Sequence, residues 1–210
     1  MLRQSATLII LFALLMICSC ANPADDKSRA VTSNAAPAAP STAAGKAEKY
    51  LIKPDTSKIE WDASKVTGAH HGSFEKFSGE IDYTGTVETS SVSITIDTDS
   101  VKADDDGLTK HLKTPDFFDV AKFPKATFKS TAIKAGGDKG ASHTVTGNLE
   151  LHGVTKSITF PATIVANPGG VNVDSSFSIN RKDFGINYAG AANNLIRDEV
   201  LLTLKIRGVK

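Results

Sequence analysis

The feature that most constrains the fold is an alternation of apolar and polar residues that recurs between residues 59 and 206. In eight segments every second residue is apolar or small, and the residues between them are mostly Lys, Glu, Asp, Ser and Thr. A period of two indicates a β-strand with one buried face and one wet face. The predicted strands span 59–63, 77–83, 92–96, 126–130, 145–151, 158–164, 171–179 and 200–206.

The connections between these segments favour pairing of neighbours along the chain. Asn167-Pro168-Gly169-Gly170 predicts a turn, and His152-Gly153 predicts a two-residue hairpin that requires positive φ at both positions. Eight antiparallel strands with one apolar face can close into an up-and-down barrel, which leaves no exposed edge. We therefore expect an all-β, eight-stranded antiparallel up-and-down barrel, with an open sandwich as the alternative.

The predicted interior contains small residues as well as large ones. The small residues on inward faces are Gly79, Gly147, Ala63, Ala126 and Ala162. An eight-stranded barrel is either filled by side chains or holds one small ligand. The small residues favour some empty space inside, although they also relieve crowding where strands bend.

Residues 98–125 form one long connection between the third and fourth strands, and connections of this length are usually functional or disordered. Asp104-Asp105-Asp106 predicts the start of a short helix over about 107–113, which Pro115 ends. The aromatic rings that follow are those of Phe117, Phe118 and Phe123. We expect them to cover one end of the barrel, either as a plug that completes the core or as a lid over a ligand.

Residues 1–19 have the pattern of a bacterial lipoprotein signal peptide. A short positive start precedes an apolar run over 7–17, which is too short to span a bilayer. Ile17-Cys18-Ser19-Cys20 resembles a lipobox, with Cys20 as the acylated first residue of the mature chain. On this interpretation the mature chain has no disulfide and no cysteine-based metal site. An ordinary cleaved signal peptide with two incidental cysteines is the alternative.

Residues 20–48 are predicted to be a disordered tether rich in Ala, Pro, Ser and Thr. Val31 is their only large aliphatic residue and aromatic residues are absent, so they bury too little surface to offset the entropy of ordering. A flexible coil of this length spans on the order of 30 Å, which would hold the domain at 49–210 clear of the lipid headgroups. Because Ala21 follows Cys20, we expect sorting to the outer membrane, facing the periplasm; exposure on the cell surface stays open.

Four stretches together resemble the YceI-like family. The central stretch runs from His111-Leu112-Lys113-Thr114-Pro115-Asp116-Phe117-Phe118 to Phe123-Pro124-Lys125-Ala126-Thr127-Phe128-Lys129-Ser130. The others lie at 93–101, 149–156 and 179–186, in the order of the family. The resemblance covers 49–210. It implies a lipocalin-like barrel with a short helix in the long loop between strands 3 and 4. It also implies binding of a polyisoprenoid, an isoprenoid quinone or a related amphiphilic lipid in the bacterial periplasm.

The inward faces and the long connection together predict an apolar ligand site. The predicted lining residues are Trp61, Phe77, Ile81, Ile94, Phe128, Leu149, Phe160 and Phe177, with Phe117, Phe118 and Phe184 at the mouth. Each of these positions is more commonly plain core. The cations available to an anionic head group are Lys110, His111, Lys113 and Arg181, which are alternatively solvated surface charges. Many YceI-like relatives carry Arg-Asp where this chain has Leu108-Thr109, so the resemblance implies no head-group contact there.

Other functional classes find little support in the sequence. The formal net charge of +1 falls to about zero without Arg3 and no basic block is present, so we expect no nucleic-acid partner. None of the five histidines has a helical i, i+4 partner, and Gly-x-Ser-x-Gly, phosphate-loop and paired-cysteine motifs are absent.

We therefore expect no catalytic residue, no metal and no cofactor other than a bound lipid. The expected role is a carrier or store anchored to the membrane by its N-terminal lipid. The alternatives are a structural, stress-related envelope lipoprotein with a filled barrel and, less favoured, a histidine-based metal enzyme. A homodimer is left open.

Overall fold

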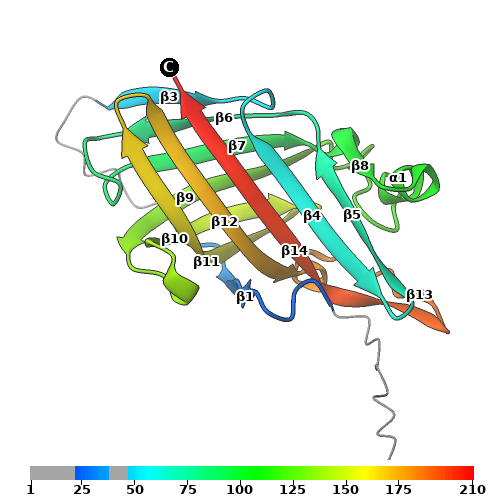
Figure 1. The fold of residues 1–210 in the computed structure, drawn as a ribbon. Helices are drawn as coiled ribbons and strands as arrows, with labels where there is room; N and C mark the ends of the chain where they lie inside the picture. Colours follow the sequence, from blue (N-terminus) through cyan, green and yellow to red (C-terminus); the bar gives the residue numbers. More distant parts are fainter. Residues whose placement is uncertain (1–21, 38–46) are drawn as a thin grey trace, which may run out of the picture.

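In the computed structural model, which describes residues 22–37 and 47–210, antiparallel strands close into an eight-stranded barrel (Figure 1). The strands are β1 (Ser28–Arg29), β2 (Val31–Asn34), β3 (Glu48–Ile52), β4 (Lys58–Lys65), β5 (Gly68–Phe74), β6 (Phe77–Tyr83), β7 (Ser91–Asp97), β8 (Val101–Ala103), β9 (Lys125–Ala135), β10 (His143–Leu151), β11 (Val154–Asn167), β12 (Gly170–Asn180), β13 (Gly190–Ala191) and β14 (Asn194–Val209). The helical elements are η1 (Thr98–Ser100), α1 (Asp106–Leu112), η2 (Asp138–Gly140) and η3 (Arg181–Phe184). In the described part of the chain, no helix is long and apolar enough to cross a membrane.

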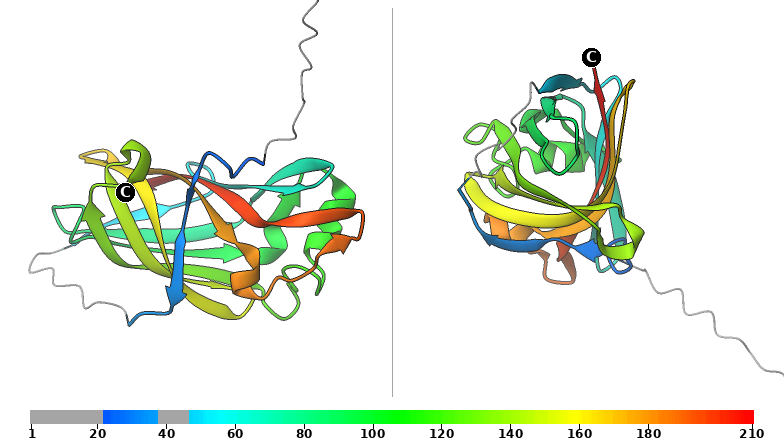
Figure 2. Two further views of the ribbon diagram at one scale, coloured as in Figure 1. Left: turned by 90° about the horizontal axis from the view of Figure 1, so that it is seen from below. Right: turned by 90° about the vertical axis from the view of Figure 1, so that its left-hand side faces the viewer.

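Three of the barrel strands are interrupted along their length. The first consists of β3 and β4, which both pair with β14, and the second consists of β5 and β6. The third consists of β7 and β8, which are joined by η1. Pairing then proceeds antiparallel from β7 through β9, β10, β11 and β12 to β14, which closes the ring. Figure 2 (right) shows this ring nearly end-on. The eight predicted strands and their sequential pairing are confirmed, and the open sandwich is not formed.

The two turns predicted from sequence have the expected geometry. His152 and Gly153 have φ values of 52° and 74°, which a two-residue hairpin between β10 and β11 requires. Asn167 and Gly170 pair at the end of β11 and β12. The Phe123 ring, at the end of the long connection, lies against His152 of this turn with ring centres 4.7 Å apart.

The short helix in the long connection is confirmed as α1. The Asp105 carboxylate accepts a hydrogen bond from the backbone N–H of Leu108 at 2.6 Å and so caps the helix N-terminus. Thr109 accepts a hydrogen bond from the backbone N–H of Ala103 at 2.9 Å, which fastens α1 to β8. Leu108 packs against the core. Leu108 and Thr109 therefore have structural roles in attaching α1 to the barrel.

The N-terminal strap, residues 22–37, is the main departure from the predicted fold. β11 and β12 pair with each other only over 163–167 and 170–174. Where they separate, β1 pairs in parallel with β12 and β2 pairs antiparallel with β11. The strap therefore fills a gap in the barrel wall (Figure 2, left). The prediction of a disordered tether over 20–48 is wrong for residues 22–37 and for Glu48, which begins β3. Residues 38–46 of the predicted tether lie outside the described residues, as do the signal peptide, Cys20 and residue 21.

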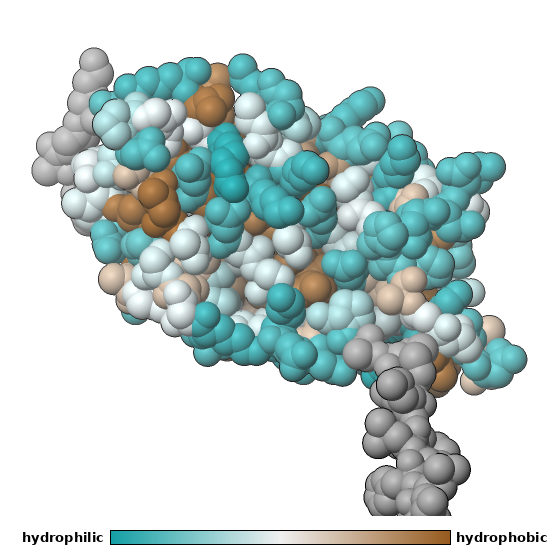
Figure 3. All heavy atoms as spheres, viewed as in Figure 1, coloured by the Kyte–Doolittle hydropathy of each residue, from teal (hydrophilic) through white to brown (hydrophobic). Residues whose placement is uncertain are grey.

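Side chains fix the strap at both ends. Asn22 accepts a hydrogen bond from the Ser64 hydroxyl of β4 at 3.1 Å, and Ala36 exchanges two hydrogen bonds with the Asn148 amide of β10. Between them Ala30 is only 5% exposed and belongs to the hydrophobic core. Figure 3 shows an outer surface that is mostly hydrophilic, as the polar face of each strand predicts.

Candidate ligand-binding cavity

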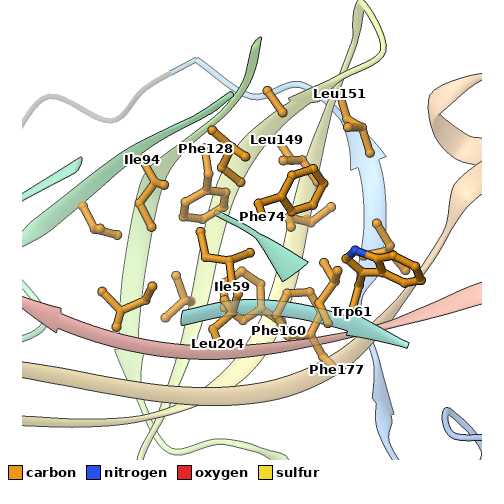
Figure 4. Close-up of a pocket in the computed structure, with 18 of the residues that line it drawn as sticks. Ile59, Trp61, Phe74, Ile94, Phe128, Leu149, Leu151, Phe160, Phe177 and Leu204 are labelled. Carbon is orange, nitrogen blue, oxygen red and sulfur yellow. The ribbon is translucent and has the colours of Figure 1, made fainter. Parts of the chain in front are cut away.

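The barrel encloses a cavity of about 220 Å³ whose exposed surface is apolar. A single buried water requires only about 10–15 Å³ of such volume, so this space is far larger than a packing defect. The inward side chains of β4, β6, β7, β9, β10, β11, β12 and β14 all contribute to the lining (Figure 4). The cavity therefore occupies the centre of the barrel.

Most of the predicted lining residues lie at this cavity. Those that line it are Trp61, Ile81, Ile94, Phe117, Phe118, Phe128, Leu149, Phe160 and Phe177. Phe77 and Phe184 are buried in the core but do not line the cavity, so their assignment is wrong. Phe77 is the first residue after the interruption between β5 and β6. The Phe184 backbone carbonyl lies 3.3 Å from the His152 ring, which places η3 against the β10–β11 turn.

Aromatic rings form one wall of the cavity. Phe160 and Phe177 stack with centroids 4.1 Å apart and planes at 11°, and Phe128 lies 5.7 Å from Phe160. Figure 4 shows the side chains of Phe160 and Phe177 below those of Phe128 and Phe74 in the view. Phe74, which the sequence analysis did not select, contacts Phe118 edge-on at 5.5 Å. It belongs to β5, whose polar and apolar residues alternate too irregularly to be recognised.

The end of the barrel beneath α1 is covered by aromatic residues. Leu112 and the two phenylalanines of the long connection, Phe117 and Phe118, line the cavity there. The Phe117 ring contacts His111 at 5.0 Å and Tyr188 at 5.3 Å. Phe117 and Phe118, predicted at the mouth, thus line this end of the cavity, and Tyr188, which no sequence pattern indicated, lies beside them.

The four predicted head-group cations have different environments. Lys110 is exposed on α1, and Lys113 pairs with Asp99 at 3.1 Å. His111 Nε2 lies 2.8 Å from an Asp116 carboxylate oxygen, outside the lining. Of these four cations, only Arg181 lines the cavity.

Arg181 is buried, and its guanidinium is already engaged by the protein. It donates hydrogen bonds to the backbone carbonyls of Ile186 at 2.7 Å, Arg197 at 3.1 Å and Ile196 at 3.4 Å. Burial lowers the pKa of Arg181, and Asp198, 3.5 Å away, acts in the opposite direction. Arg181 therefore joins η3 to the start of β14, which leaves few of its donors for a ligand.

Trp61 carries a polar atom whose hydrogen-bonding capacity is unused. The residue is 6% exposed, and its Nε1–H has no acceptor among residues 22–37 and 47–210. Leaving a buried donor unpaired costs roughly 1–3 kcal/mol. The indole lies over Gly72, where a Cβ atom would approach within 2.4 Å of the ring. Figure 4 shows the indole nitrogen on the ring edge that faces most of the other labelled side chains.

Within the described ranges, no three His, Cys, Asp or Glu side chains converge in a way that could hold a metal ion. The fold and the cavity together define an eight-stranded β-barrel with an apolar interior space, a class in which the interior can hold one small ligand.

Comparison with known proteins places the chain in a family. The YceI-like domain matches residues 50–207, and the chain therefore belongs to the YceI-like family. A UPF0312 protein of Pseudomonas putida strain W619 is 35% identical over 160 residues, which are 72% of this chain and 80% of that protein. A UPF0312 protein of Pseudomonas aeruginosa is 36% identical over 148 residues, which are 67% and 74% of the two chains.

Solved structures share the fold. BcnA of Burkholderia cenocepacia superposes with a TM-score of 0.67 at 25% identity, covering 75% of this chain and 99% of BcnA. A protein of Saccharophagus degradans, described as a polyisoprenoid binding domain implicated in plant cell wall breakdown, superposes with a TM-score of 0.61. It is 19% identical, and the match covers 79% of this chain and all of that one. The expected lipocalin-like barrel and the family assignment are confirmed.

Proposed function

We propose that this protein binds one long-chain apolar lipid inside its barrel and acts as a carrier or store rather than as an enzyme. The observation that carries the proposal is the central apolar cavity, lined from the strands around the barrel. The polyisoprenoid binding domain among its structural neighbours supports the same ligand class. A filled structural barrel, the main alternative, is disfavoured by the size of this cavity.

The energetics of the cavity suit a hydrocarbon chain. Each CH₂ group moved from water into the barrel contributes about 0.8 kcal/mol, so a few isoprene units offset the cost of immobilising the ligand. A polar molecule would lose its hydration and find almost no partners on the lining.

Trp61 favours a ligand that also carries an oxygen acceptor. Its unpaired Nε1–H would gain a hydrogen bond if the occupant displaced the carbon atoms covering it and presented a carbonyl or hydroxyl oxygen. An isoprenoid quinone or a polyprenol meets this requirement, whereas a pure hydrocarbon does not. We propose ligands of that type.

The proposed location is the cell envelope. The lipobox-like sequence ending at Cys20 supports an acyl anchor, and Ala21 supports sorting to the outer membrane on the periplasmic side. A carrier of apolar lipid in this compartment would shield its cargo from water between membranes.

The test uses a variant that fills the cavity. Ala63 lines the cavity near Trp61, and Phe in its place should occupy ligand volume. We expect Ala63→Phe to weaken binding of geranylgeraniol and of a short-chain isoprenoid quinone at least about tenfold, or about 1.4 kcal/mol. Binding is measured by the change in fluorescence of Trp61, the single tryptophan of the chain.

Ala135→Phe is the matched control, because Ala135 is exposed at the end of β9 and does not line the cavity. It should bind both compounds like the unmodified protein. Equal affinity in all three proteins, or no binding to any, would refute the proposal.

A further inference from the structure

One corner of the barrel exposes apolar side chains where two hairpins meet. The tip, residues 65–67 and 188–197, comprises the turn between β4 and β5 and the segment that includes β13 and the start of β14. Val66 is 60% exposed and Leu195 is 50% exposed, and Tyr188 is also partly exposed. These are three of the six exposed large hydrophobic residues in the described part of the chain. Figure 3 shows apolar surface at this corner of the molecule.

Hydrogen bonds join the two hairpins of the tip. The backbone N–H of Val66 donates a hydrogen bond to the Leu195 carbonyl at 3.1 Å, and the Thr67 hydroxyl donates to the Asn194 side chain at 2.8 Å. Arg181 holds the same segment from inside through the carbonyls of Ile196 and Arg197. The exposed apolar side chains are therefore presented in a fixed arrangement.

The charges of the tip suit an anionic lipid surface. The tip contains two cations, Lys65 and Arg197, and no carboxylate. Neither cation forms a salt bridge with a described residue. Exposed apolar side chains flanked by cations, with a tyrosine at the margin, are typical of surfaces that insert shallowly among the headgroups of anionic membranes.

The course of the chain places the proposed anchor beside this tip. Asn22 is hydrogen-bonded to Ser64, which directly precedes the tip in sequence. Asn22 follows Cys20 by two residues, so an acylated Cys20 would be tethered within about 7 Å of Asn22. An anchor so close to Ser64 would hold this corner of the barrel against the bilayer.

The tip also lies next to the mouth of the cavity. Ile196 lines the cavity from the base of the tip, and Tyr188 contacts Phe117, which covers the mouth. Figure 1 shows β13 at the end of the barrel that carries α1. We propose that the tip docks on a bilayer containing anionic phospholipid, inserting Val66 and Leu195, and so directs the mouth toward the membrane with which the ligand exchanges. The exchange step rests on the proposed function, whereas the docking does not.

The experiment compares two exposed valines at different places on the barrel. The two variants are Val66→Cys at the tip and Val165→Cys on β11, where Val165 is 52% exposed. Each is labelled with an NBD fluorophore in the full chain isolated from its membrane. The proteins are reconstituted into vesicles of phosphatidylethanolamine and phosphatidylglycerol with a trace of nitroxide-bearing lipid. We expect the nitroxide to quench the label at residue 66 several-fold more than the label at residue 165. The wild-type chain, treated in parallel, gives the background from its own cysteines.

Equal quenching at the two positions, or stronger quenching at residue 165, would overturn the docking. A second variant, Val66→Asp with Leu195→Asp, changes no cavity-lining residue. It should bind geranylgeraniol in detergent like the unmodified chain but deliver it to acceptor vesicles several-fold more slowly; an unchanged delivery rate also contradicts the proposal. If no variant binds the probe, the proposed function fails, while the NBD comparison still decides the docking.

Discussion

Replacing Arg181 with methionine is expected to lower the stability of the barrel by about 3 kcal/mol, because it removes one buried and two partly buried hydrogen bonds at once, and a buried carbonyl left without a donor costs roughly 1–3 kcal/mol. The carbonyls concerned are those of Ile186, Ile196 and Arg197. For a domain of this size the change corresponds to a fall of roughly 6–12 °C in the midpoint of thermal unfolding. The measurement is a thermal melt followed by circular dichroism.

Lys182→Met is the neighbouring control. Lys182 is solvent-exposed and pairs with the same Asp198 at 2.9 Å, and an exposed ion pair contributes only about 0–1 kcal/mol. If Arg181→Met and Lys182→Met lowered the stability by similar amounts, the charge near Asp198, and not the hydrogen bonds to the carbonyls, would stabilise this end of the barrel.

The second large effect concerns the N-terminal strap. Ala30→Asp would place a carboxylate in the core between β11 and β12, and we expect it to cost about 3 kcal/mol. The adjacent Val31 is 68% exposed, so Val31→Asp should change stability by less than about 0.5 kcal/mol. If the strap did not pack into the barrel wall, the two substitutions would change stability by similar amounts.

The strap can respond by detaching while the barrel stays folded, so two readouts are needed. Thermal melting reports unfolding of the barrel. Limited trypsin digestion reports detachment, because Lys27 and Arg29 flank Ser28 within the strap. We expect Ala30→Asp to raise the rate of cleavage at these sites or to lower the melting midpoint. If neither changes, the strap is not part of the wall.

The barrel was predictable because its strands bury side chains on one face. That burial imposes a period of two on the sequence from Ile59 to Ile206, and hairpin turns such as His152-Gly153 leave their own local signal. The strap leaves no such signal, since it joins the barrel through backbone hydrogen bonds, a few side-chain hydrogen bonds and two buried alanines, Ala24 and Ala30. Any residue except proline can supply those backbone groups.

The sequence indicates which residues face the barrel interior but not where along the barrel they lie. Alternation indicates which face of a strand is inward, and this was sufficient for residues such as Ile94 and Leu149. It does not indicate where along the barrel a residue lies, so Phe77 is predicted to line the cavity although it fills the surrounding core. Phe184, predicted at the mouth, lies in η3 outside the predicted strands, where alternation gives no information. The role of Arg181 depends on three carbonyls brought to it by the fold, and no sequence pattern encodes that convergence.

The strap also changes how the proposed anchor would act. A flexible tether would let the domain move on the order of 30 Å from the membrane. Because residues from Asn22 onward are bound to the barrel, a lipid on Cys20 would instead hold the domain at the bilayer surface. Direct exchange of ligand with that bilayer is the arrangement most compatible with this geometry.

Whether the barrel binds a lipid is decided by what the isolated protein contains. The protein and its Ala63→Phe variant would be purified identically from the native membrane, extracted with organic solvent and analysed by mass spectrometry. We expect close to one long-chain apolar lipid per unmodified chain and a strong depletion of that lipid in the variant. The same lipids in equal amounts from both proteins, or none above the level of the surrounding membrane, would contradict this expectation.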